Sequence, residues 1–213
     1  MIIGPKFKIA RRLGSRVFPK TQTTKFSLSD SSSFKKPGGR RPKALSEYGQ
    51  QLLEKQKARY TYLLKEGQFS NYVKKVRGLH KPGVNPNALL YQNLESRLDN
   101  IVFRFGLALS RAAARQMVSH GHILVNGRRL NIPSHQLQVG DVVAIRPQSM
   151  SLGVARLAGT PVGEEKPERG RQVPSWLAYD ELKKEGKVLG QPLWGETESD
   201  INFGAILEFY SRV

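Results

Sequence analysis

The stretch that decides the fold is RLDNIVFRFGLALSRAAARQMVSHGHILVNGRRLNI, residues 97–132. Its first apolar residues recur at helical spacing, and Gly106 is suited to the left-handed backbone that commonly ends a helix. Ser110, a good N-cap, then starts a short helix that runs to Gly121. An alternating run leads into Asn126-Gly127, the strongest short signal for a β-hairpin. The stretch therefore predicts a helix-turn-helix pair followed by a hairpin.

The flanking sequence extends this unit in both directions. Residues 142–146 alternate after the Gly140-Asp141 turn and predict a third strand, which makes the sheet small and antiparallel. On the other side, the apolar residues within 90–105 keep one helical period, so we expect a single long helix that begins at Pro86-Asn87. The compact unit is predicted as helix, helix and sheet.

Helices are also expected further out along the chain. One is predicted from the N-cap Ser46 to Gly67 and a second over residues 69–83, where a Lys-Pro-Gly break ends it. The apolar set at 201–210 predicts a last helix that packs back on these two. The Pro-Ser-Trp-Leu sequence at 174–177 is interpreted either as a helix start or as an anchor.

The predicted fold class is α+β, with a mainly helical domain, an inserted small helix-turn-helix plus antiparallel-sheet module, and a basic N-terminal arm. The arm has weak apolar periodicity and cannot build a core by itself, so we expect it to order against a partner. The expected divisions are the arm at 1–44, a helical domain at 45–96 completed by 172–213, the module at 97–160 and a linker at 161–171.

Charge is distributed unevenly along the chain. The formal net charge is +18, which favours a polyanionic partner, nucleic acid first. Residues 1–44 carry 12 Lys and Arg against one Asp, whereas residues 151–213 carry 8 basic and 10 acidic side chains. The C-terminal part is therefore not expected to bind RNA. Cysteine is absent, which excludes disulfides and thiolate metal sites, and no apolar run reaches the length of a membrane span.

Arginines of the central stretch favour an RNA contact. Arg111 and Arg115 are four residues apart, so both lie on one helix face and can bridge phosphates. Two arginines alone would more simply be a solvated face. The adjacent hairpin adds Arg128 and Arg129 after its turn, and a helix face and a hairpin tip that both present arginine make a clamp for an RNA backbone.

The motifs at 97–104, 110–120 and 123–128 together resemble the RNA-binding module named after ribosomal protein number four of the small subunit. Sequence near both termini resembles that ribosomal protein family itself, so the resemblance covers nearly the whole chain and is weakest at 17–38 and 150–195. It implies a structural, non-enzymatic constituent of the small subunit that binds small-subunit ribosomal RNA first and nucleates assembly at a helical junction. The implied location is the cytoplasmic ribosome, with an organellar ribosome as alternative.

The resemblance also implies partners. These are mRNA, at the channel through which it enters, and small-subunit ribosomal proteins number five and number three, with an influence on decoding accuracy. No cofactor, metal, membrane or small-molecule substrate is implied. The residues expected to contact RNA are Lys6, Lys8, Arg11, Arg12, Arg40, Arg41, Lys43, Lys55, Lys57, Arg59, Lys74, Lys75, Arg77, Arg97, Arg104, Ser110, Arg111, Arg115, Gln116, His120, Asn126, Gly127, Arg128 and Arg129.

Two other interpretations stay open from the sequence. The module also occurs in pseudouridine synthases, and Arg97-Leu98-Asp99 resembles the tripeptide that holds their catalytic Asp. Here the tripeptide falls inside an amphipathic helix, where a surface ion pair or a link to RNA-binding arginines is the simpler interpretation. A free-standing RNA-binding factor is the other alternative. His120 and His122 have no third ligand nearby in sequence, so a metal site is not expected.

Overall fold

The computed structural model of the chain describes residues 3–22, 26, 28, 45–79, 83, 85–151, 173–180, 183, 185–195 and 201–212. Two compact units make up the chain: Met1–Pro82 with Ser199–Val213, and Gly83–Glu198. Each unit has its own core. Within the described residues, no helix is both long and apolar enough to cross a membrane.

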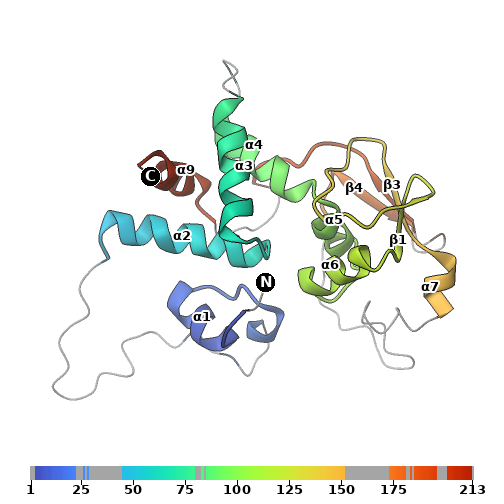
Figure 1. Cartoon of the computed structure of the whole chain (residues 1–213), viewed down its shortest axis with the longest axis horizontal. Coiled ribbons are helices and arrows are strands. Elements are labelled where there is room, and N and C mark those ends of the chain that lie inside the picture. The colour runs from blue at the N-terminus through green and yellow to red at the C-terminus, as the bar shows by residue number, and fades with distance from the viewer. Residues whose placement is uncertain are drawn as a thin grey trace. The chain divides into compact units, whose positions relative to one another are not determined.

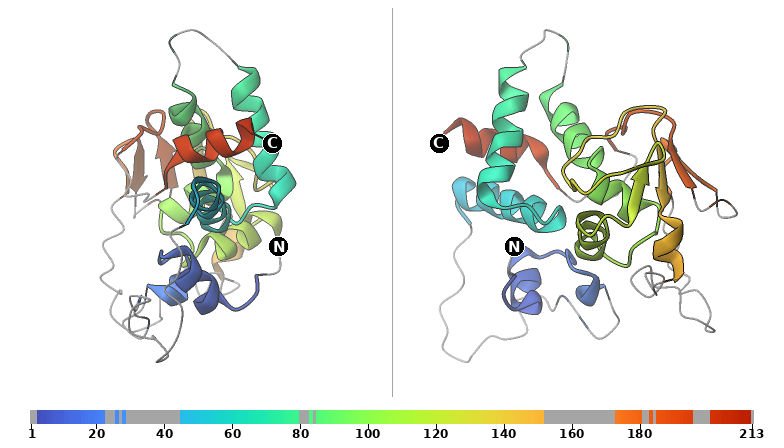
Figure 2. Two further views of the ribbon diagram at one scale, coloured as in Figure 1. Left: turned by 90° about the vertical axis from the view of Figure 1, so that its left-hand side faces the viewer. Right: turned by 45° about the vertical axis from the view of Figure 1, so that its right-hand side comes forward.

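The first unit is built on helices α2 (Glu47–Thr61), α3 (Glu66–Gly78) and α9 (Phe203–Ser211). The Ser46 side chain accepts a hydrogen bond from the Gly49 N–H at 3.2 Å, which confirms the predicted N-cap. Helix α9 packs against α2 and α3, as the apolar set near the C-terminus predicted (Figures 1 and 2).

Helix α2 ends earlier than predicted. Its last residue is Thr61, and Gly67 lies in the first turn of α3 and not at the end of α2. The chain turns at Leu63, whose φ of 54° is in the left-handed region. Because no glycine lies at this turn, no local pattern predicted it.

The N-terminal arm is partly folded against the same unit. Helix α1 (Lys6–Leu13) ends at Gly14, whose φ is 62°, and a single 3₁₀ turn follows at Pro19–Thr21. Ala10, Phe18 and Phe26 are buried together, and Tyr60 of α2 packs against them. These arm residues therefore pack with α2 of the same unit, whereas the sequence was interpreted as an arm that orders only against a partner.

The second unit begins with α4 (Pro86–Glu95) and α5 (Leu98–Arg104), where a single long helix was predicted. The chain is extended at Arg97, which forms a β-bridge with Gln136. The Leu98 and Asp99 N–H groups donate to carbonyls at 133–135, so a distant loop takes the hydrogen bonds that would continue α4. Helix α6 (Arg111–Ser119) follows, capped by Ser110 as predicted.

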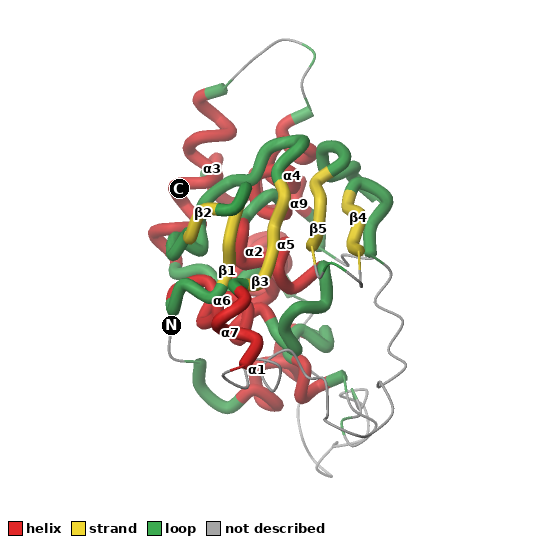
Figure 3. The backbone as a smooth tube through the Cα atoms, turned by 90° about the vertical axis from the view of Figure 1, so that its right-hand side faces the viewer, coloured by secondary structure: helices red, strands yellow, loops and turns green. Residues whose placement is uncertain are grey.

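The antiparallel sheet has five strands in the order β2-β1-β3-β5-β4 (Figure 3). Strands β1 (Ile123–Val125), β2 (Arg128–Arg129) and β3 (Val142–Ile145) confirm the predicted small sheet. Strands β4 (Leu177–Asp180) and β5 (Glu185–Val188) were missed, and β5 pairs with β3 through Val143 and Gly186. Residues 177–188 therefore belong to this unit, whereas the sequence assigned them to the helical domain.

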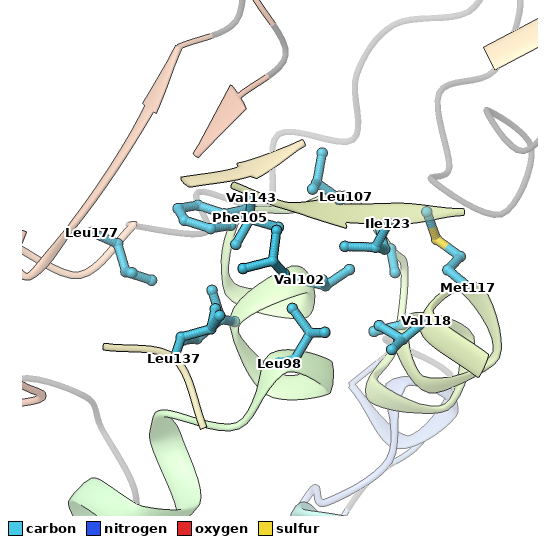
Figure 4. Packing of buried hydrophobic residues seen from close by; sticks show 14 of the residues in the cluster. Leu98, Val102, Phe105, Leu107, Met117, Val118, Ile123, Leu137, Val143 and Leu177 are labelled. Carbon is cyan, nitrogen blue, oxygen red and sulfur yellow. The ribbon is translucent and has the colours of Figure 1, made fainter. Parts of the chain in front are cut away.

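The core of the second unit lies between helices α5 and α6 and one face of the sheet (Figure 4). Trp176 is buried in it, which supports the anchor interpretation of 174–177; the helix start is wrong, because Leu177 begins β4. Pro147–Ser151 forms the short helix α7. The predicted linker at 161–171 lies outside the described residues. Together the two units confirm the α+β class.

Candidate RNA-binding interface

The hairpin tip is held in a fixed geometry. Asn126 and Gly127 have φ of 51° and 76°, the left-handed pair that a tight hairpin turn with matching twist requires. The Asn126 side chain donates to Asp141 Oδ1 at 2.8 Å and accepts from the Val142 N–H at 2.9 Å. Asn126 thus ties the turn to β3, and Arg128 and Arg129 follow it with exposed side chains.

The two arginines of α6 lie on one face as predicted, and both are anchored. Arg115 Nη2 donates to Asp99 Oδ2 at 2.7 Å, and Arg111 Nε donates to Asn100 Oδ1 at 2.7 Å. The Arg111 guanidinium also lies 4.5 Å from the centre of the Phe103 ring. Because both side chains are already oriented in the free protein, a ligand bound through them would cost less rotamer entropy.

Asp99 is buried, and not part of a surface ion pair. Its side chain lies between two arginines, since Arg97 donates to both carboxylate oxygens at 3.0 and 2.9 Å and Arg115 to one of them. Arg97 is only 4% exposed. We correct the expectation that Arg97 contacts RNA: its guanidinium neutralises the buried Asp99.

A second carboxylate beside it orients another arginine. Glu95 is fully buried, and its oxygens accept from Arg104 Nε and Nη2, both at 2.9 Å. Asn100 Nδ2 donates to the same carboxylate at 2.8 Å while its oxygen accepts from Arg111. Glu95, Asn100 and Asp99 thus form a layer of acceptors beneath the arginines of the module.

In the first unit, part of the predicted basic surface is structural. Lys55 is 7% exposed, donates to Glu66 Oε1 at 2.8 Å and lies 4.3 Å from the centre of the Phe209 ring. A buried, paired ammonium is not available to an RNA phosphate, so the expectation for Lys55 is corrected. Glu66 has two further partners: Arg59 Nη1 lies 3.2 Å from its Oε2, and the Tyr210 hydroxyl donates to its Oε1 at 2.8 Å.

These partners shift the pKa values of Glu66 and Tyr210 in opposite directions. Burial alone would raise the pKa of Glu66, but the hydrogen bonds from Lys55 and Tyr210 and the nearby positive charges outweigh it and lower the pKa. Burial and the hydrogen bond to Glu66 raise the pKa of Tyr210 well above its ordinary value. The Glu66 carboxylate is therefore stabilised in its charged form by the folded unit.

We expect this site to give a pH-dependent stability. A depressed pKa adds stability above the ordinary Glu value of 4.5, and the gain is lost as pH falls through the lower folded pKa. Glu66→Gln should therefore be less stable than the parent at pH 7, with the difference shrinking below about pH 4.5. Urea denaturation followed by circular dichroism at pH 7, 5 and 4 measures this. The exposed Glu185→Gln is the control, and a Glu66→Gln difference that stays constant with pH contradicts the assignment.

The remaining predicted residues fall into three groups. Arg40, Arg41 and Lys43 lie outside the described residues. Lys57 approaches Glu54 at 3.6 Å, and Arg77 donates to the Tyr210 carbonyl at 2.7 Å. Those with exposed side chains are Lys6, Lys8, Arg11, Arg12, Lys74, Lys75, Gln116 and His120.

The sequence prediction omitted two residues of the module, His122 and Arg146. His122 directly precedes β1 and Arg146 directly follows β3, and the Arg146 N–H donates to the His122 carbonyl at 2.8 Å. The pairing of β1 with β3 could have placed them together, because Ile123 is opposite Ile145. Among the described residues, no group of three His, Asp or Glu side chains gathers where it could hold a metal ion.

A helix pair on a small antiparallel sheet, with arginines on one helix face and at a hairpin tip, defines a small RNA-binding module. Residues 96–143 match the family model described as the S4 domain, and residues 1–95 match the one described as the Ribosomal protein S4/S9 N-terminal domain. The two matched ranges join at the start of the module.

Full-length relatives agree with both models. The chain is similar to small ribosomal subunit protein uS4 of Acetivibrio thermocellus (40% identical), of Christiangramia forsetii (42%) and of Roseiflexus castenholzii (41%), each over at least 98% of both chains. The chain belongs to the family of small ribosomal subunit protein uS4. The resemblance and the structural ribosomal role are thereby confirmed, and neither alternative, a free-standing factor or an RNA-modifying enzyme, is favoured.

Proposed function

We propose that this chain binds small-subunit ribosomal RNA through the arginine face of α6 and the tip of the β1–β2 hairpin, with α1 as a second basic surface. The observation that carries the proposal is the fixed orientation of Arg111 and Arg115 by Asn100 and Asp99. A rigid set of guanidiniums selects an RNA shape, whereas mobile lysines would bind any polyanion.

The action we propose is binding without catalysis. Lys and Arg side chains neutralise phosphates and release counterions, while the rigid module recognises the geometry of a helical junction. Early binding of this kind would nucleate assembly of the subunit. Asp99 supports the non-enzymatic assignment, because its oxygens are held by Arg97 and Arg115 and it is 3% exposed.

Family membership supports the finer proposals. We infer a cytoplasmic ribosome as the location, neighbours that include small-subunit ribosomal proteins number five and number three, and a position beside the channel through which mRNA enters. Contact with these neighbours would influence decoding accuracy. Cross-linking within assembled small subunits identifies both the RNA junction and the protein neighbours. Cross-links to small-subunit proteins other than number five and number three, with none to these two, would contradict the proposed neighbours.

The hairpin tip provides a direct test of the interface. Arg128 is exposed, so Arg128→Ala should leave folding intact while removing one phosphate contact. The slope of log affinity against log salt should become shallower by about 0.7–0.9, and affinity near 0.15 M salt should fall about fivefold. Filter binding to small-subunit ribosomal RNA over a salt series measures both. Lys183→Ala removes an equally exposed charge outside the interface and serves as control; equal losses in the two variants would argue against the hairpin contact.

A further inference from the structure

Basic side chains from four segments lie at one end of the sheet in the second unit. His120 is the C-cap of α6, His122 precedes β1, Arg129 lies in β2 and Arg146 follows β3. Strands β2, β1 and β3 are neighbours in the sheet, so segments that are separate in sequence converge (Figure 3). We refer to these four residues with Ser149 of α7 as the His122 cluster.

Hydrogen bonds fix the geometry of the His122 cluster. His122 Nδ1 is 3.0 Å from Ser149 Oγ, and Ser149 is 2% exposed. The rings of His120 and His122 are 5.9 Å apart between centroids, and Arg129 Nη2 donates to the His120 carbonyl at 3.3 Å. Because Nδ1 is engaged by the hydroxyl, Nε2 is the ring nitrogen of His122 that can donate to a ligand.

Positive charge gathers around His122, and the described residues place no compensating carboxylate against it. Burial lowers the pKa of His122, and the charges of His120, Arg129 and Arg146 lower it further. Among the described residues, no carboxylate is hydrogen-bonded or ion-paired to any member of the cluster; Arg146 donates to the neutral side chain of Gln148 in α7. Glu185 of β5 lies opposite Ala144, two residues before Arg146, and is among the described carboxylates that form no hydrogen bond or ion pair with the cluster. An anion bound at the cluster would therefore offset positive charge that no described carboxylate offsets.

We propose that the His122 cluster binds a backbone phosphate of RNA and that His122 takes up a proton as it does so. This inference rests on the proposed function, because it adds a site to the same RNA interface. Arg129 belongs to both the hairpin tip and the cluster, so an RNA strand at the tip lies close to His122. Arg146 and His122 extend the interface from the hairpin to the end of β3.

The sign of the pH effect follows from the charges. Near pH 7 the free protein holds His122 mainly neutral, since its pKa is below the ordinary 6.5. A phosphate offsets the charges of His120, Arg129 and Arg146, which raises the pKa of His122 in the complex. RNA binding therefore takes up a proton, and affinity should rise as pH falls, by up to tenfold for each unit by which the pKa rises.

The experiment measures affinity of the full chain for small-subunit ribosomal RNA at pH 7.5, 6.5 and 5.5 and constant ionic strength. We expect about a threefold to tenfold gain between pH 7.5 and 5.5. His122→Asn keeps a partner for Ser149 but cannot be charged, so most of the gain should disappear. His120→Asn removes one of the groups whose charge lowers the pKa of His122 and should keep the larger part of the gain in affinity. His135→Asn, which replaces an exposed histidine elsewhere in the unit, should keep all of it.

Arg146→Gln provides a second variant if His122→Asn does not fold. It removes one charge from the cluster, so affinity should fall at every pH and the gain on acidification should become smaller. A His122→Asn protein, or failing that an Arg146→Gln protein, with the parent pH profile overturns the inference while leaving RNA binding intact. Loss of RNA binding by the parent chain at every pH would instead overturn the proposed function, so the two failures are distinguishable.

Discussion

Replacing Asp99 with alanine lowers the free energy of unfolding of the second unit by about 3–5 kcal/mol, which is the usual effect of breaking a buried ion pair. The substitution removes the carboxylate that accepts hydrogen bonds from Nε and Nη2 of Arg97, which is 4% exposed, and from Nη2 of Arg115. Arginine keeps its charge even when it is buried, so the guanidinium of Arg97 cannot relieve this cost by losing a proton.

Urea denaturation followed by circular dichroism measures this loss. Glu185→Ala removes an exposed carboxylate from the same unit and should change stability by no more than about 0.5 kcal/mol. Asp99→Asn keeps the shape of the side chain and covers the case in which the alanine variant does not fold; it too should be less stable than the parent. Parent-like stability of both variants would show that Asp99 is not the charge that compensates the buried Arg97.

The elements that the sequence predicted well are those specified by neighbouring residues. The caps Ser46 and Ser110 and the turn at Asn126-Gly127 depend on side chains and backbone preferences within about four positions. The apolar periods located the helices for the same reason. These local signals were enough to place the arginines of α6 on one face and those of the hairpin at its tip.

The sequence-based predictions that were wrong concern elements and side chains whose structure depends on contacts between distant parts of the chain. Helices α4 and α5 share one apolar period, and they are separated by contacts of residues 97–99 with the distant segment 133–136. Strand β5 has no apolar alternation to reveal it; Gly186 is required because a Cβ there would lie 2.4 Å from the Phe105 ring. Lys55 has the charge of an RNA-binding residue, but the position of Glu66 on the next helix makes it structural. Burial of a charge is decided by partners that local patterns do not contain.

Replacing Lys6, Lys8, Arg11 and Arg12 with glutamine lowers affinity for small-subunit ribosomal RNA by about two to three orders of magnitude near 0.15 M salt. If each side chain neutralises one phosphate, the slope of log affinity against log salt becomes shallower by about 3. All four side chains are exposed, and the buried face of α1 is formed by other residues, chiefly Ala10, so the fold should persist. The contact of Arg11 with the Phe26 ring, at 5.7 Å, is a minor loss at an exposed site.

Salt provides the internal control for this variant. The contribution of counterion release disappears as salt approaches about 1 M. The plots of log affinity against log salt for the parent and the variant should therefore converge there if α1 contributes charge alone. Lines that stay parallel across the salt range would mean that α1 does not contact phosphates. Lys183 and Lys187 offer a matched change on the β4–β5 hairpin, where glutamine substitutions should leave the slope unaltered. Because α1 and the module lie in different units, convergence for α1 together with a pH effect confined to His122 would show that charge and shape are supplied by separate parts of the chain.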